Sequence, residues 1–193
     1  MSLLAGGCAS SPPVRHYHLE PLPGAQTDLQ RDYSIGVGPI RFPEYLSRPQ
    51  IVTRTAGSAL KIAEFDRWSE PVAGAFLDVL AINLDQLLQD AVVIQFPYGP
   101  LMQPEYRMLG RVSRFDTDTT GVAVLNIQWG VIHAEGGEMV VRVRRDEYRA
   151  QANDPGDYDS LVSALNATIE AFSKTAAQEI AKNCSPCATA HNT

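Results

Sequence analysis

The chain has few of the features that identify a membrane-spanning, disulfide-bonded or nucleic-acid-binding protein. No run of apolar residues approaches the roughly 20 that a membrane-spanning helix needs. Only three of the 193 residues are cysteine, and all three lie near the termini, so no disulfide framework holds a core together. A formal net charge of -6 argues against nucleic-acid binding, which requires concentrated Lys and Arg. With 45% hydrophobic and 20% charged residues, the composition is that of an ordinary globular protein.

The sequence also has little that would catalyse a reaction or bind a metal ion. It contains no GxSxG, HExxH, Walker A or GxGxxG motif. His16 and His18 share a strand face, but no third metal ligand with suitable spacing is visible. Asp116 and Asp118 resemble the start of a calcium loop that lacks its closing glutamate, so they predict a hairpin turn. We therefore expect no catalytic residue, no metal site and no cofactor.

Two of the cysteines, Cys184 and Cys187, form a CxxC motif at the C-terminus. A redox-active CxxC begins a helix, whose positive end lowers the thiol pKa, whereas this motif follows a predicted helix. A zinc site would need two further ligands, and His191 supplies only one. We interpret residues 184–193 as a flexible tail, in which a disulfide between the two cysteines is the favoured state.

The remaining cysteine, Cys8, follows the residues LAGG, as the lipid-bearing cysteine of a bacterial lipobox does. A secretory signal peptide also needs a basic segment and an apolar stretch of roughly 7 to 15 residues, which residues 1–7 cannot hold. We therefore expect residues 1–13 to comprise a shortened signal remnant, the lipobox and a tether. The tether is the ASSPP segment at 9–13, whose composition favours an extended chain. Several acyl chains on Cys8 would anchor a folded body stably to a membrane.

Hydrophobic periodicity predicts one α/β domain over residues 14–183. The expected strands and helices are residues 14–20, 33–40, 50–55, 59–65 and 92–98, three longer strands at 105–116, 121–134 and 138–151, and helices at 71–90 and 158–182. The predicted fold is a single mixed β-sheet, largely antiparallel in its second half, with two long helices packed on one face.

Alternation in the middle of the chain predicts which strand residues are buried. Trp129 shares one strand face with Leu125 and Ile127, so we expect it to belong to the core. Arg144 and Arg145, with the nearby Arg142, stand beside acidic residues and indicate a solvated strand face rather than a nucleic-acid patch.

The most unusual stretch is the loop within residues 37–54. Pro39, Pro43 and Pro49 restrict its backbone and the residues before them, so its shape is set before any partner binds. The candidate docking residues that it and a nearby tryptophan display are Arg41, Phe42, Tyr45, Leu46, Arg48 and Trp68. Aromatic, aliphatic and Arg side chains of this kind suit a protein interface. The alternative is architectural, with Tyr45 and Leu46 closing the sheet edge while the arginines pair with acidic neighbours.

Cys8, HYHLE, VGPIRFPEYLSRPQIVTR and EFDRWSEPV together resemble the ABC-type transport auxiliary lipoproteins, the PqiC/YmbA-like family. The resemblance runs from Cys8 to the last helix. It implies a non-enzymatic periplasmic lipoprotein held by its lipid in the outer membrane of a Gram-negative cell. It also implies work with an ABC transporter and an MCE-type substrate-binding protein that carries phospholipid between membranes.

Two other functions are consistent with the same residues. One is a structural envelope lipoprotein that docks other periplasmic proteins. The other is a periplasmic small-ligand-binding protein, which would need a cleft with perturbed titratable groups. The sequence leaves self-association into a homo-oligomer open.

Overall fold

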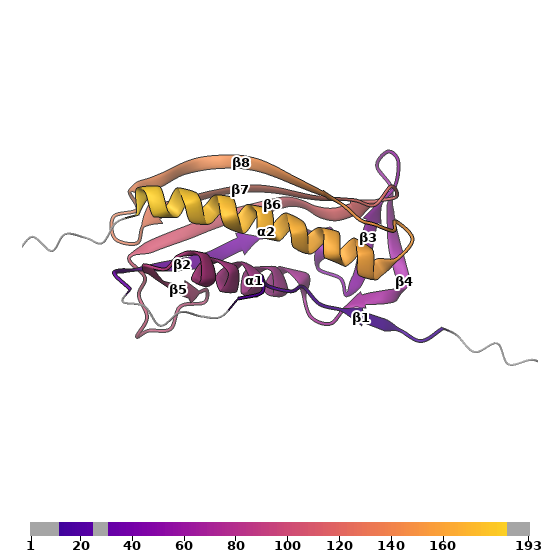
Figure 1. Ribbon diagram of the computed structural model, residues 1–193, viewed down its shortest axis with the longest axis horizontal. Coiled ribbons are helices and arrows are strands. Elements are labelled where there is room, and N and C mark those ends of the chain that lie inside the picture. Colours follow the sequence, from indigo (N-terminus) through magenta and orange to yellow (C-terminus); the bar gives the residue numbers. More distant parts are fainter. Residues whose placement is uncertain (1–11, 25–30, 185–193) are drawn as a thin grey trace, which may run out of the picture.

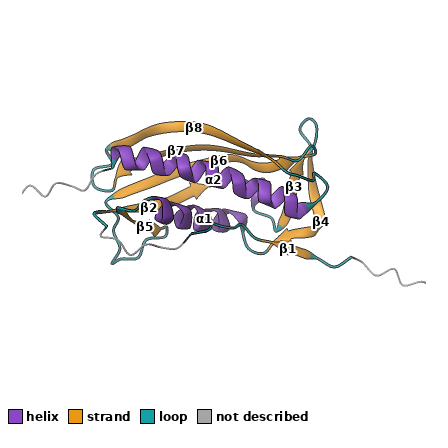
Figure 2. Ribbon diagram, in the orientation of Figure 1, coloured by secondary structure: helices purple, strands orange, loops and turns teal. Residues whose placement is uncertain are grey.

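A computed structural model describes residues 12–24 and 31–184 of the chain (Figure 1). The elements are β1 (Arg15–Tyr17), β2 (Tyr33–Arg41), a 3-10 turn η1 (Glu44–Leu46), β3 (Gln50–Arg54), β4 (Leu60–Trp68), α1 (Val72–Leu87), β5 (Ala91–Gln95), β6 (Tyr106–Asp118), β7 (Val122–His133), β8 (Met139–Gln151) and α2 (Tyr158–Asn183). Figure 2 shows the strands forming one layer and both helices lying on the same face of it. The predicted single mixed sheet with two helices on one face is confirmed.

β6 is the strand around which the sheet is organised. One edge pairs antiparallel with β7, which pairs antiparallel with β8, as predicted for the second half of the chain. Two strands share the other edge of β6. β2 runs parallel to the first part of β6, as far as Arg41, which is paired with Arg111. β3 runs parallel to the last part of β6, beginning at Thr53, which is paired with Thr117. β5 continues the sheet beyond β2, and β4 and β1 continue it beyond β3. Residues 42–49, which connect β2 to β3, therefore pass the stretch of β6 that neither strand covers.

The core lies between the sheet and the helices and is built from aromatic rings of distant segments. Phe172 of α2 lies 5.6 Å from Trp129 of β7 and 6.4 Å from Phe76 of α1, measured between ring centroids. Trp129 is only 1% exposed, which confirms its predicted place in the core. Its indole nitrogen donates a hydrogen bond of 2.8 Å to Asp146, so the buried polar atom is satisfied.

Both helices lie where the sequence predicts them, although α1 ends at Leu87, three residues before its predicted end. α1 starts immediately after Pro71, which suits a first turn because proline lacks the amide hydrogen that would be unpaired there. α2 is capped by Asp157, whose carboxylate accepts a hydrogen bond of 3.1 Å from the amide of Ser160. Within the described ranges, neither helix combines the length and apolarity that crossing a membrane demands.

The N-terminal segment differs from the strand predicted at 14–20. Only residues 15–17 pair in the sheet, alongside β4. The chain then leaves the sheet and crosses the helices: the amide of Leu22 donates to Asn83 of α1 at 2.7 Å, and the amide of Glu20 donates to Asn166 of α2 at 3.2 Å. We call residues 18–24 the N-terminal strap. The alternation that suggests a strand here arises because Leu19 is buried while its neighbours are exposed.

Candidate docking surfaces

The proline-rich loop is fastened into the fold by its aromatic and aliphatic residues. The Phe42 ring lies 5.2 Å from that of Phe76 and 6.3 Å from that of Phe115, both in the core. Leu46 is buried in η1, and Trp68 is buried at the end of β4, where its amide donates to the carbonyl of Pro49 at 2.7 Å. The loop thus fills the gap between β2 and β3 and seals the core at that edge.

A buried carboxylate, Asp116, holds the same loop from the sheet side. Its side chain has no exposed surface and accepts hydrogen bonds from the Tyr45 hydroxyl at 2.9 Å, the Arg54 guanidinium at 2.8 Å and the Arg114 guanidinium at 2.7 Å. Burial, followed by the nearby Asp116 charge, raises the pKa of Tyr45 to about 12, so its hydroxyl stays protonated and donates. We call these four residues the Asp116 cluster.

Sequence reasoning missed the Asp116 cluster because its members come together only in the folded sheet. Tyr45 is 71 residues away from Asp116 along the chain, and Arg54 is 62 residues away. The prediction of a hairpin turn holds for Asp118, whose carboxylate accepts from the amides of Thr120 and Val122 at 2.8 and 3.0 Å. The two aspartates of one motif therefore have separate structural roles.

The structure divides the six candidate docking residues into an inner and an outer set. Three of them, Phe42, Leu46 and Trp68, contribute to the core, and Tyr45 is partly buried in the Asp116 cluster. Arg41 and Arg48 are exposed, and the Arg48 guanidinium donates to the carbonyl of Tyr45 at 3.0 Å. The arginines are thus what this loop offers to a partner. Cys8, the candidate lipid attachment site, lies outside the described residues.

A second exposed surface lies on the face of β6, β7 and β8 that is turned away from the helices, which we call the open face (Figure 2). Four residues in register cross it from β2 to β8: Arg41 is paired with Arg111, Arg111 with Gln128, and Gln128 with Arg145. All four are exposed. We call them the arginine row. Sequence reasoning assigned Arg145 to a solvated strand face, but the row depends on pairing between strands and is not visible in the sequence.

Two adjoining hollows on the open face share the middle of the arginine row. One has a volume of about 440 Å³ and is lined by Arg111, Gln128 and Arg145 together with polar neighbours, including Ser113 and Asn126. The other has a volume of about 400 Å³ and contains an apolar group of residues beside the row. That group, which we call the apolar dip, consists of Leu109, Gly130, Ile132, Met139 and Val143.

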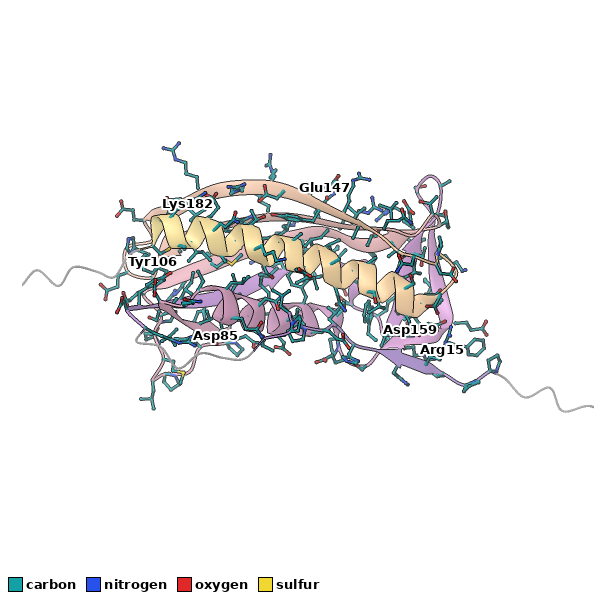
Figure 3. All side chains as sticks on the ribbon, viewed as in Figure 1. Arg15, Asp85, Tyr106, Glu147, Asp159 and Lys182 are labelled. Atoms are coloured by element: carbon teal, nitrogen blue, oxygen red, sulfur yellow. The ribbon has the colours of Figure 1, made fainter. Side chains whose placement is uncertain are left out.

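Two acidic side chains, Asp146 and Glu147, also line the first hollow, and both are engaged with other partners. Glu147, which Figure 3 labels on β8, accepts from the Arg149 guanidinium at 2.7 Å. Asp146 accepts from Trp129 and Arg144. Both carboxylates are therefore paired with other groups, whereas Arg111 and Arg145 of the row form no ion pair among the described residues.

The remaining sequence candidates are placed apart from both surfaces. His16 is exposed on β1, and His18 lies beyond the end of that strand, 3.3 Å from Glu20. Within residues 12–24 and 31–184, no group of His, Cys, Asp or Glu side chains is arranged to hold a metal ion. Cys184 is a buried free thiol at the C-cap of α2, and burial raises its pKa to about 12. Cys187 and His191 lie outside the described residues.

Comparison with known proteins places this fold among solved structures and within a family. A crystal structure of an uncharacterized protein is 21% identical, with a TM-score of 0.73 and coverage of 88% of this chain and 99% of that one. A protein from Xanthomonas campestris is 14% identical, with a TM-score of 0.69 and coverage of 88% of this chain and 95% of that one. Both show a shared fold, while no curated protein matches the chain. The family model for the ABC-type transport auxiliary lipoprotein component matches residues 17–177, and the chain therefore belongs to that family.

Proposed function

We propose that this protein is a non-enzymatic lipoprotein held by Cys8 at the periplasmic face of the outer membrane. In this role it serves as an auxiliary, docking component of an ABC transport system. Its partner is an MCE-type substrate-binding protein, and the cargo is phospholipid moving between the inner and outer membranes. The observation that carries the proposal is the family match over residues 17–177, combined with the lipobox pattern that ends at Cys8.

The position of β1 supports anchoring of the body by one end. Arg15 of β1 and Lys182 of α2 are labelled at opposite ends of the long axis in Figure 3. The residues between Cys8 and β1 span at most about 25 Å when fully extended, so a lipid on Cys8 would keep the β1 end near the membrane. The length of the body would then project into the periplasm, with the sheet and the proline-rich loop accessible to partners.

The proline-rich loop contributes to docking in this proposal through Arg41 and Arg48. Their neighbours in the loop are packed into the core, so the backbone that carries the two arginines is already fixed and loses little conformational freedom on binding. Ala9, rather than aspartate, follows Cys8, and by analogy with enteric bacteria this favours sorting to the outer membrane.

Lipid attachment is tested by labelling cells with radioactive palmitate while they express the full-length precursor with Cys8 intact or with Cys8→Ser. We expect label only on the wild type, and fractionation of that protein with the outer membrane. Equal labelling of both proteins would contradict attachment at Cys8, and recovery with the inner membrane would contradict the sorting.

The transport role is tested by crosslinking the wild-type protein in its native membrane and identifying the captured proteins. We expect components of an ABC transporter and its MCE-type protein. Capture of other envelope proteins alone would favour a structural lipoprotein instead. Binding of a small periplasmic molecule without any protein partner would favour the ligand-binding alternative.

A further inference from the structure

We propose that the open face is a docking site for a partner protein segment that is both acidic and apolar. The acidic side chains of that segment would bind the arginine row, and its apolar side chains would fill the apolar dip. This inference rests on the proposed function in one respect, since it assigns the partner to the same transport system. The surface itself is argued from charge and packing alone.

The arginines of the row form no ion pair within the described part of the chain. None of the ion pairs among the described residues involves Arg41, Arg111 or Arg145. Arg41 and Arg111 are register partners on adjacent strands, which lie about 4.8 Å apart. Like charges placed opposite one another destabilise a sheet. A chain with a formal net charge of -6 thus concentrates unpaired positive charge on one face, where an acidic partner would neutralise it.

The apolar dip lies directly beside the arginine row on the open face. Leu109 and Val143 lie two residues before Arg111 and Arg145, and Gly130 lies two residues after Gln128 on the antiparallel strand β7, a distance of about 7 Å along each strand. Gly130 keeps the dip open, because a Cβ there would lie 3.1 Å from the Val141 carbonyl oxygen and project toward Val143. Met139 is 49% exposed and Val143 is 53% exposed, so the dip offers apolar surface for burial.

The shape and composition of the open face favour a protein over a small ligand. A small-molecule site buries most of its ligand in a concave pocket, whereas the two hollows adjoin on an open sheet surface. Arginine and methionine are enriched at protein interfaces and lysine is depleted, and no lysine lines either hollow.

The proposal is tested by placing a photo-crosslinking amino acid at Gln128, the centre of the arginine row, in the full-length lipoprotein in its native cells. Mass spectrometry of the adduct identifies the crosslinked segment. We expect a protein segment rich in Asp or Glu and in apolar residues. The double variant R111Q/R145Q should reduce the adduct at least tenfold, because it removes two of the three charges in the row. The matched variant K61Q/K174Q removes the same charge from exposed residues elsewhere and should leave the adduct unchanged.

The other possible results at Gln128 overturn either the docking surface or the proposed function. A lipid adduct, an adduct with a second copy of this chain, or a segment without acidic residues would each identify a different occupant. Equal loss in both double variants would indicate a general charge effect. If the wild type co-purifies with transport proteins but Gln128 gives no adduct, the surface is wrong and the proposed function stands. If an acidic segment is captured from a protein unrelated to transport, the surface stands and the proposed function fails.

Discussion

At the residue scale, Asp116 shows how one buried carboxylate joins a loop to a sheet. It has no exposed side-chain surface, and its two guanidinium partners on Arg54 and Arg114 are 30% and 21% exposed. Removing one member of a buried ion pair leaves the other charges desolvated without compensation. We therefore expect Asp116→Ala to lower the free energy of unfolding by about 3 kcal/mol, measured by urea denaturation.

Two milder substitutions calibrate the loss at Asp116. Tyr45→Phe removes one hydrogen bond to the carboxylate and should lower the free energy of unfolding by about 1.5 kcal/mol. Glu44→Ala changes an exposed neighbour and should stay within about 0.5 kcal/mol of the wild type. If Asp116→Ala were no more destabilising than Glu44→Ala, the cluster would have no role in holding the loop.

At the scale of elements, the N-terminal strap depends on one buried amide of α1. Asn83 is 1% exposed; its oxygen accepts from Leu22 in the strap, and its nitrogen donates to Ser173 of α2 at 3.1 Å. Asn83→Ala leaves the Leu22 amide without this partner, at a cost of about 1 to 3 kcal/mol. Because the lost bond belongs to the strap, hydrogen exchange followed by mass spectrometry should show faster exchange of residues 18–24. Asn166→Ala, whose bond to the strap is exposed, should change exchange much less. Unaltered exchange in Asn83→Ala would mean that the strap is held by its apolar contacts.

At the scale of the whole molecule, local pattern predicts the elements, and long-range pairing determines the surfaces. The strands β6, β7 and β8 are predictable because their alternation is long and unbroken, and α2 because its apolar stripe repeats along its length. The inward packing of Phe42 and Trp68 is not predictable, because it depends on the gap between β2 and β3. The arginine row likewise requires the register of four strands, which no local signal in the sequence specifies.

The same topology leads us to expect two parts of unequal stability. β3 pairs with β6 at only two positions, Thr53 with Thr117 and Arg54 with Asp118, whereas β6 and β7 pair along nearly their whole length. Within the sheet, the unit of β1, β4 and β3 is therefore joined to the other strands by a short ladder, which the Asp116 cluster and core residues such as Ile51 and Trp68 supplement. Segments with few connections open at a lower free energy than the rest of a protein.

We accordingly expect native-state hydrogen exchange to separate these two parts. Amides of β3 and β4 should exchange together through a partial opening. Amides of β6 and β7 should exchange only with global unfolding, and the free energy of their exchange should therefore fall more steeply with urea concentration. Asp116→Ala should widen the difference, because it weakens the connection between the parts, and Glu44→Ala should leave it unchanged. Exchange of all four strands at one free energy and one urea dependence would contradict the division. The sheet would then unfold as one cooperative unit, and the loop between β2 and β3 would pack against that unit without joining two separately opening parts.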